Sequence, residues 1–535
     1  MYDYIIVGGG SAGCVLANRL SASGKYQVCL LEAGPVDKNL LISIPAGVIA
    51  LMRSKVYNWQ FRTEPEPHCG NRKMLWPRGK TLGGSSSINA QVYIRGNAWD
   101  YDHWASLGNE GWSYKDVLPL FRKSENCESG ADEFNGQGGG LNVAEHRSTN
   151  VLSHAFVQAA QQAGYPLTPD FNGAQQEGVN FYKAMQKGGE RCSNARAFLR
   201  EAEGRKNLTV VTGAQATRVL FEGKRAVGVR YCSGGLYKDI QASREVLLCG
   251  GAINSPQLLL LSGVGASAEL SKHGIQQVHE LPGVGKNLQD HLDVLVSTRE
   301  KTHYAVSFSP LSFWQSIKML FQYIFGKRGA LSSNIAESGG FIKTRPEEPV
   351  PDLQLHFVPL AFSEHAQKLG PLFGHAYTLM VCNLRPISRG EITLSSNDPL
   401  AAPSIRANYL DHPLDLEKLV IGIHKARAIM AQPAFAPHRR EELMPGPAVQ
   451  SDEQIGDWIR QNAETIYHPV GTCKMGVDEM AVVDPQLKVR GLQGLRVIDA
   501  SIMPTLIGGN TNAPATMIAE KGAAMILEDA AKPVI

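Results

Sequence analysis

A glycine-rich turn near the start of the chain limits its fold more than any other feature of the sequence. Residues 8–13 read GGGSAG and follow an apolar run at residues 4–7. A helical pattern comes next, and a second apolar run at residues 28–31 ends in Glu32. This order predicts a βαβ unit that binds an adenine dinucleotide, with a purely structural glycine turn as the alternative.

Each glycine of this motif has its own physical reason. Gly8 permits the tight turn after the first strand, Gly10 lets the backbone approach a pyrophosphate, and Gly13 lets the helix pack closely on the strand. The N-terminus of the helix directs its free N–H groups at the phosphates. Glu32 follows the second strand, where its carboxylate can accept hydrogen bonds from a ribose.

Length and composition set the class of protein. A chain of 535 residues is too long for one hydrophobic core, so we expect at least two layers or domains. With 43% hydrophobic and 19% charged residues, it has the composition of a globular protein. The net charge of +3 is small and there is no Lys/Arg run, so we expect no nucleic-acid partner.

The cysteines indicate the redox environment. There are nine, an odd number, with no CxxC pair or Cys/His cluster, which predicts reduced thiols and no metal site. The first predicted strand starts at the second residue, which leaves no room for a signal peptide ahead of it. We therefore expect a cytoplasmic protein, with peripheral attachment to the inner membrane surface as an alternative.

One apolar stretch, residues 311–325, is rich in aromatic residues. It is interrupted by Gln315, Ser316, Lys318 and Gln322, so it is too short and too broken to span a membrane. The favoured interpretation is an amphipathic helix packed on the core. The alternatives are a lid over an apolar pocket and a shallow anchor at a membrane surface.

Changes in residue pattern divide the chain into four parts. Residues 1–150 hold the first part of the dinucleotide-binding domain, and residues 151–295 mix further strands of that domain with part of a second one. Residues 296–460 alternate like an antiparallel sheet, with strands expected at residues 353–358, 377–384 and 390–394. Residues 461–535 return to the dinucleotide-binding pattern. We therefore predict an α/β protein, α+β overall. A Rossmann-like domain is built from both chain ends and joined to an antiparallel-sheet domain that binds substrate.

Further motifs resemble the signatures of a known family. Residues 79–89, GKTLGGSSSIN, form a second glycine-rich loop that suits phosphate or ring oxygens, although a plain surface loop fits equally well. Together with residues 251–256 (GAINSP), 261–265 (LSGVG) and 468–472 (HPVGT), this loop resembles the glucose-methanol-choline (GMC) oxidoreductase family. The resemblance covers essentially the whole chain. Within the family the chain is most similar to bacterial FAD-dependent dehydrogenases of medium-chain aliphatic alcohols, with choline and polyethylene glycol dehydrogenases nearby.

The resemblance implies FAD as the cofactor, held at three places. Contacts to the adenosine and pyrophosphate are expected from Gly8, Gly10, Ser11, Ala12, Gly13, Glu32, Ala33 and the backbone of Val219. Contacts to the isoalloxazine are expected from Gly83, Gly84, Ser85, Asn89, Ala90 and Val92. The pyrophosphate and the pyrimidine side of the flavin are expected at Asp499, Ala500, Asn512 and Ala513.

Two features of the resemblance bear on the flavin itself. Some family members attach FAD through a histidine just before the motif asparagine, where this chain has Ile88, so we predict non-covalent FAD. A helix is expected to start just after Asn512, and its N-terminus would direct positive partial charge at the flavin N1/O2 region.

His468 is the predicted catalytic base. Oxidation of an alcohol by hydride transfer requires removal of the hydroxyl proton, and a neutral imidazole suits that task near neutral pH. Asn512 resembles the second catalytic position of the family, where its amide would donate to the developing alkoxide. Asp290 and His291 are assigned a structural role or a place near the flavin edge. Glu337 either points into the pocket or is a hydrogen-bonded loop carboxylate.

The expected reaction is oxidation of a primary alcohol to an aldehyde. If the stretch 311–325 and Phe357, Leu360 and Phe362 line the pocket, the substrate is expected to be an apolar primary alcohol, with a medium-chain aliphatic alcohol favoured, because burying unpaired polar groups there would be costly. A quaternary ammonium such as choline would need a cage, for which the candidates are Tyr467, Trp314 and Glu337.

The acceptor and the reaction class have alternatives. The resemblance favours a quinone or another non-oxygen acceptor. An alcohol oxidase, a choline or polyethylene glycol dehydrogenase, and a flavoprotein lyase or decarboxylase of the same fold are alternatives. A flavin-binding protein without catalysis is disfavoured, because both His468 and Asn512 are present.

Overall fold

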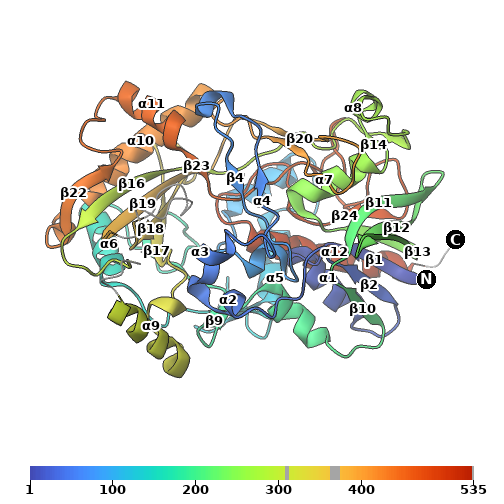
Figure 1. The fold of residues 1–535 in the computed structure, drawn as a ribbon, viewed down its shortest axis with the longest axis horizontal. Coiled ribbons are helices and arrows are strands. Elements are labelled where there is room, and N and C mark those ends of the chain that lie inside the picture. Colours follow the sequence, from blue (N-terminus) through green and yellow to red (C-terminus); the bar gives the residue numbers. More distant parts are fainter. Residues whose placement is uncertain (308–312, 362–373, 533–535) are drawn as a thin grey trace.

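A computed structural model describes residues 1–307, 313–361 and 374–532. It contains two seven-stranded sheets, which lie toward opposite ends of the long axis of the molecule (Figure 1). Phe362 and the start of the apolar stretch at residues 311–325, both expected near the substrate, fall outside the described residues.

The first sheet confirms the predicted βαβ unit. Strand β1 (Tyr2–Val7) leads into helix α1 (Ser11–Ser21), and β2 (Val28–Leu31) then pairs parallel with β1. The sheet has the order β10 (Leu208–Val211), β2, β1, β13 (Leu236–Leu248), β12 (Arg225–Ser233), β11 (Gln215–Glu222). The second half of β13 pairs parallel with β1, and its first half continues into an antiparallel ribbon with β12.

The two ends of the chain complete the same fold, as predicted. Strand β24 (Leu495–Val497) pairs parallel with β13, and the long helix α12 (Asn512–Ala531) packs against α1. The buried carboxylate of Glu520 on α12 accepts from Arg19 on α1 at 2.7 Å and lies 2.9 Å from Lys123 on α5 (Tyr114–Ser124). A buried carboxylate with two cationic partners fixes the C-terminal helix on the N-terminal one.

The second sheet is antiparallel. Its order is β22 (Arg439–Met444), β16 (Leu292–Glu300), β19 (Ala376–Asn383), β18 (Leu353–Val358), β17 (Ser338–Ile342), β7 (Gly178–Phe181), and β23 (Glu464–Thr465) also pairs with β16. Helices α6 (Val151–Gln162), α10 (Pro413–Met430) and α11 (Asp452–Asn462) contribute with it to one apolar core.

Side-chain alternation along β18 decides which residues can reach a substrate. Phe357 stacks on Phe156 of α6, with ring centroids 5.1 Å apart, so it belongs to the helix-covered face. Its neighbours His356 and Val358 point to the other face, as the period of two requires. Phe357 is therefore core, and the sequence-based assignment of Phe357 to the pocket wall is wrong. Leu360 does not line the cavity either, although it is buried in the same side-chain cluster as Val358 and Met380, which do.

The remaining elements lie around these two sheets. The other α-helices of the described residues are α2 (Leu40–Ser43), α3 (Val48–Leu51), α4 (Ala98–Ser106), α7 (Gly251–Leu261), α8 (Ser267–Lys272) and α9 (Phe313–Gly326). Short strand pairs join β3 (Phe61–Arg62) with β4 (Leu75–Trp76), β5 (Glu125–Cys127) with β6 (Leu141–Val143), β8 (Gln186–Lys187) with β9 (Glu190–Arg191), β14 (Val264–Gly265) with β15 (His279–Glu280), and β20 (Glu391–Thr393) with β21 (Ser404–Arg406). Within the described ranges, no helix has the length and apolar character needed to cross a bilayer.

Candidate active site

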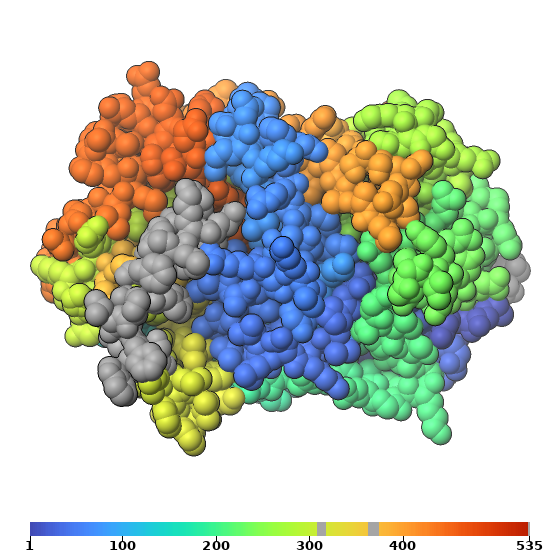
Figure 2. Space-filling view, viewed as in Figure 1, coloured from blue at the N-terminus to red at the C-terminus, as the bar shows by residue number. Residues whose placement is uncertain are grey.

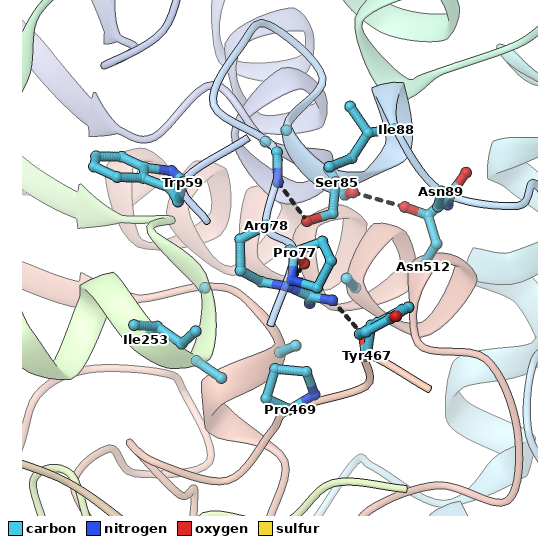
Figure 3. Close-up of a pocket in the computed structure, with 18 of the residues that line it drawn as sticks. Trp59, Pro77, Arg78, Ser85, Ile88, Asn89, Ile253, Tyr467, Pro469 and Asn512 are labelled. Carbon is cyan, nitrogen blue, oxygen red and sulfur yellow. Dashed lines mark hydrogen bonds between the residues drawn. The ribbon is translucent and has the colours of Figure 1, made fainter. Parts of the chain in front are cut away.

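A deep cavity extends between the two sheets. At one end it is lined by the carboxyl ends of β1, β2 and β13, and at the other by β18 and β19. Ligands of open α/β sheets bind at the carboxyl ends of the parallel strands, so the first end is where a dinucleotide is expected. Figure 3 shows the middle of the cavity, where the second glycine-rich loop faces residues around His468.

The glycines at the N-terminus of α1 are required by close backbone contacts. Gly8 has φ +105°, and a Cβ there would lie 2.5 Å from the carbonyl oxygen of Cys249 on the neighbouring chain segment. A Cβ on Gly13 would lie 1.9 Å from the oxygen of Gly8. No side chain fits at either place, so the helix starts directly against the strand ends with its N–H groups toward the cavity.

Glu32 lies at the end of β2, on the wall of the cavity. Its carboxylate accepts from the backbone N–H of Gly9 at 2.9 Å and from that of Gly34 at 2.7 Å. Burial raises its pKa to about 7, although these hydrogen bonds act in the opposite direction. A carboxylate held in this way beside the glycine turn is suited to accept from ribose hydroxyls.

The loop at residues 79–89 packs on the first glycine turn. The N–H of Gly83 donates to the oxygen of Gly9 at 2.7 Å, and a Cβ on Gly84 would lie 2.7 Å from the Cα of Gly10. Gly83 and Gly84 are both buried and have positive φ angles. These contacts exclude the plain surface loop considered from the sequence.

Asp499 connects the motif at residues 251–256 to the C-terminal segment of the chain. Its carboxylate accepts from the N–H of Gly251 at 2.8 Å, the hydroxyl of Ser255 at 2.6 Å and the N–H of Ser501 at 2.8 Å. Burial raises the pKa of this carboxyl group. The carboxylate thereby fixes the start of α7 to the segment that follows β24.

Most residues expected at the cofactor line this cavity. They are Gly8, Gly10, Ser11, Ala12, Glu32, Ala33, Gly84, Ser85, Asn89, Ala90, Val92, Asp499, Ala500 and Asn512. Four do not line it: Gly13, Gly83, Val219 and Ala513. The backbone N–H of Val219 donates to the hydroxyl of Ser262 at 2.8 Å, and the chain reaches the cavity instead at Ala214, Gln215 and Ala216.

His468 is held by its backbone. Its N–H donates to the Asp290 carboxylate at 2.6 Å, and the hydroxyls of Tyr409 and Thr465 donate to the second oxygen of that carboxylate. Burial raises the pKa of Asp290 to about 6, and the nearby Arg78 guanidinium opposes this effect. Asp290 is therefore a structural acceptor beneath the His468 segment, one of the two roles expected for it.

The hydrogen bonds of His291 fix the proton on the His468 ring. His291 Nε2 lies 3.1 Å from the carbonyl oxygen of Leu384, which can only accept, so His291 carries its hydrogen on Nε2. The bare Nδ1 of His291 then accepts from His468 Nδ1, 2.9 Å away. These two hydrogen bonds leave a lone pair on His468 Nε2. A general base needs such a lone pair to take a proton.

The amide beside this lone pair belongs to Asn510. Its Nδ2 lies 3.2 Å from His468 Nε2, while its Oδ1 accepts from Gln354 Nε2 at 3.1 Å. The Gln354 contact orients the Asn510 amide with its N–H toward His468. Gln354 is fully buried on β18.

Asn512, the second catalytic residue proposed from the sequence, is held elsewhere. Its Oδ1 accepts from Ser11 at 2.6 Å, and its Nδ2 donates to Met185 sulfur at 3.0 Å and to Asn194 at 3.2 Å. The Asn512 side chain thus lies by the N-terminus of α1 (Figure 3). The amide beside His468 therefore belongs to Asn510, two residues before the predicted Asn512, because tertiary contacts turn Asn510 toward His468.

The surroundings of His468 keep its imidazole neutral. Burial lowers its pKa well below the ordinary value, and the nearby His291, His356 and Arg78 act in the same direction. Arg78 is buried, which lowers its own pKa to about 10, so it stays charged at neutral pH. A neutral His468 with a bare Nε2 can take a proton from a hydroxyl group.

The cavity wall near His468 is largely apolar. It is formed by Val48, Ile49, Met52, Ile335, Ala336, Val358, Met380 and Ile466. Among the described residues that line the whole cavity, Glu32 and Asp499 are the carboxylates, and both lie at the dinucleotide end. His356 also faces the cavity, and neither of its ring nitrogens has a hydrogen-bond partner within the described part of the chain.

Glu337 is a hydrogen-bonded loop carboxylate, the second of the two interpretations weighed for it. It accepts from the N–H of Asn150 at 2.7 Å and from the hydroxyls of Ser153 at 2.8 Å and Ser333 at 2.6 Å. It does not line the cavity. The second cage candidate, Tyr467, does line it, and the side chain of Trp314 is outside the described set.

Comparisons with known proteins agree with this architecture. A protein from Pseudomonas putida named alcohol dehydrogenase (acceptor) is 52% identical over 98% of this chain and 96% of its own length. An oxygen-dependent choline dehydrogenase from Chromohalobacter salexigens is 47% identical over 97% of this chain and 94% of its own. Pyridoxine 4-oxidase from Mesorbium loti superposes with a TM-score of 0.87 at 31% identity, covering 98% of this chain and 99% of that one.

The family assignment rests on most of the chain. Residues 2–293 and 386–519 match the two parts of the GMC oxidoreductase family. The family's cofactor needs a carboxylate for the ribose, a helix N-terminus for the pyrophosphate and a loop beside the ring. Glu32, the N-terminus of α1 and residues of the loop from Gly84 to Ala90 line the cavity where they would supply these contacts. The chain belongs to the GMC oxidoreductase family, whose cofactor, FAD, fits the cavity.

Proposed function

We propose that this protein oxidises a primary aliphatic alcohol to the aldehyde, with His468 as the base and a quinone-like compound as the final electron acceptor. The observation that carries the proposal is the hydrogen-bond chain from Leu384 through His291 to His468. It leaves an unprotonated nitrogen on a neutral, buried imidazole, where the Asn510 amide now contacts it and a substrate hydroxyl can donate its proton.

The roles of the side chains follow from their geometry. The substrate hydroxyl replaces the direct contact of His468 Nε2 with Asn510 Nδ2, 3.2 Å in this structure, and the two nitrogens move apart to admit it. It donates to His468, which takes its proton, and it accepts from the Asn510 amide as negative charge develops on oxygen. When bound, FAD would supply the acceptor for the hydride that leaves the alcohol carbon. The alcohol thus loses one proton and one hydride, and an aldehyde results.

The same cavity provides for holding the cofactor. Glu32 would accept from the ribose, and the N-termini of α1 and α12 would face the pyrophosphate and the flavin pyrimidine with their free N–H groups. Ile88 lines the cavity where some relatives carry a histidine, so we propose that the cofactor is held without a covalent bond at this position.

The walls near His468 favour an uncharged, apolar substrate. No carboxylate among the described lining residues is placed to pair with a quaternary ammonium, since Glu32 and Asp499 both lie at the dinucleotide end. Aliphatic side chains instead surround the space, so an alkyl chain gains contact area there. The similarity to an alcohol dehydrogenase at 52% identity supports this choice over choline, whose dehydrogenase is 47% identical.

The substrate class can be tested by mixing the yellow protein with alcohols in the absence of oxygen and following the oxidised-flavin absorbance. We expect fast bleaching with 1-octanol and much slower bleaching with choline or a short polyether. Faster bleaching by choline would overturn the substrate assignment. A flavoprotein lyase would turn over its substrate while its flavin stayed oxidised, so octanol-dependent bleaching also separates the two reaction classes.

The acceptor requires a separate assay. We expect the reduced protein to pass electrons to a soluble quinone and to form little peroxide in air. The similarity to the alcohol dehydrogenase named for an unspecified acceptor supports this expectation. Peroxide equal in amount to the alcohol consumed would instead identify an oxidase.

A further inference from the structure

Helix α9 carries an apolar ridge on the outside of the molecule. Leu320 is 48% exposed, Phe321 58%, Ile324 56% and Phe325 79%. Their spacing of one, three and four residues puts all four on one face of the helix. The Phe321 and Phe325 rings stack with centroids 5.6 Å apart, so the ridge is continuous. Contiguous exposed apolar surface of this kind marks an interaction site.

The helix is firmly attached, so the ridge is not the frayed end of a loose segment. Tyr323, on the opposite face, is only 3% exposed, and the Lys327 ammonium lies 4.5 Å from its ring centroid. Lys327 also pairs with Glu190 at 3.0 Å, which connects the end of the helix to β9. In Figures 1 and 2 the helix lies at the lower left edge of the molecule.

The charged side chains of the segment that contains the ridge are all positive. Between Glu300 and Glu337 the sequence has no acidic residue and four basic ones, Lys301, Lys318, Lys327 and Arg328. Lys318 lies on the helix and Arg328 just after it; both are exposed, and neither forms an ion pair within the described part of the chain. Aromatic and aliphatic side chains flanked by cations are typical of helices that lie in the headgroup region of anionic bilayers.

The ridge is also connected to the cavity by the chain itself. After α9 comes a short 3-10 turn at Ala330–Ser332, and the next residues, 334–336, line the cavity on its apolar side. That turn contacts the turn at Pro45–Gly47, which leads into α3, where Val48 and Ile49 line the same side. The ridge therefore lies next to the apolar half of the cavity, not the dinucleotide half.

We propose that α9 docks the protein on an anionic lipid surface, with Phe321 and Phe325 inserted among the acyl chains and Lys318 and Arg328 at the headgroups. A second copy of the chain is a poorer occupant. A symmetric dimer places the same patch against itself, so Lys318 and Arg328 of the two copies would repel each other. A bilayer supplies apolar contact and negative charge together. Insofar as the proposed function holds, docking brings the apolar half of the cavity to the phase where apolar alcohols and quinones dissolve.

Vesicle binding tests this proposal without using enzyme activity. The holoenzyme is sedimented with vesicles of phosphatidylcholine alone and of phosphatidylcholine mixed with phosphatidylglycerol. We expect binding to the mixed vesicles, weakened by salt. F321S/F325S should lower it about tenfold or more, and K318E/R328E several-fold on anionic vesicles only. The matched control is L236S/Y237S, which removes comparably exposed apolar residues, 66% and 55%, from β13 of the first sheet.

The outcomes separate the alternatives. Flavin content and melting temperature of F321S/F325S should match the wild type, because both side chains are exposed. Wild-type protein that ignores mixed vesicles, or an equal loss of binding in the control, would overturn the proposal. So would a wild-type dimer that F321S/F325S dissociates without any vesicle binding, which would assign the ridge to a second copy. Failure of octanol to bleach the flavin would leave the vesicle result untouched, so the two proposals fail separately.

Discussion

Substituting His291 tests the proton arrangement from which the role of His468 was derived. In His291→Leu the His468 Nδ1–H loses the acceptor that now lies 2.9 Å away. An unpaired buried donor costs about 1–3 kcal/mol. This cost shifts the equilibrium between the two neutral forms of the His468 ring by roughly 5- to 150-fold, away from the form with its hydrogen on Nδ1. In the other form Nε2 carries the hydrogen and cannot accept the hydroxyl proton. We therefore expect the rate of flavin reduction by alcohol to fall about 10- to 100-fold.

His291→Asn is the matched rescue. An asparagine oxygen takes nearly the place of Nδ1 and can accept from His468, while its NH₂ group can donate to Leu384. We expect this variant to recover most of the rate, with KM close to the wild type in both variants, because neither change touches the apolar wall. The assay is stopped-flow bleaching by 1-octanol without oxygen, on samples matched for flavin content. Full activity in His291→Leu, or equal losses in the Leu and Asn variants, would refute the reasoning.

Three further predictions follow from the site. Asn510→Leu should slow flavin reduction by about 100-fold at unchanged flavin content, whereas Asn512→Leu should chiefly lower flavin content; the reverse pattern would return the catalytic role to Asn512. In Gly84→Ala the new Cβ would lie 2.7 Å from Gly10 Cα, at a φ of +52°. This variant should have a lower flavin content and be less stable to thermal unfolding by about 1–3 kcal/mol. Gly24→Ala, with φ +72° and no atom within 4 Å of the new Cβ, controls for backbone strain alone. Because burial lowers the pKa of His468, kcat/KM should stay level through neutral pH and fall only as protonation of His468 sets in below its ordinary value of about 6.5; an acid limb at or above that value would contradict the burial argument.

The fold could be predicted mainly from local sequence motifs. The glycine turn at residues 8–13, the strands on each side and the acidic residue at position 32 are neighbours in sequence, so spacing alone locates the unit. The predicted strands at residues 353–358 and 377–384 are β18 and β19, because alternation is also a local signal. The segment predicted at residues 390–394 is β20, which pairs with β21 outside the large sheets; pairing partners are long-range and leave no local trace.

The site residues that were not predicted from the sequence are decided by where their side chains point, not by their place in a motif. Asn510 and Asn512 share one turn, and only contacts with Gln354 and Ser11, from distant parts of the chain, decide which faces His468. A one-residue difference along β18 likewise separates core Phe357 from cavity-lining His356. The alternation of Leu355 and Phe357 with Gln354 and His356 separates the two faces of β18, but it does not tell which face is covered by a helix and which lines the cavity.

The most direct test of the account is the anaerobic reduction of the flavin by 1-octanol in His468→Gln, compared with the wild type and with His424→Gln, a change at an exposed histidine paired with Asp452. The account predicts fast bleaching in the wild type and the control, and a loss of about 10²- to 10⁴-fold in His468→Gln, as expected for removal of a general base. Bleaching of His468→Gln at the wild-type rate would show that His468 does not take the hydroxyl proton.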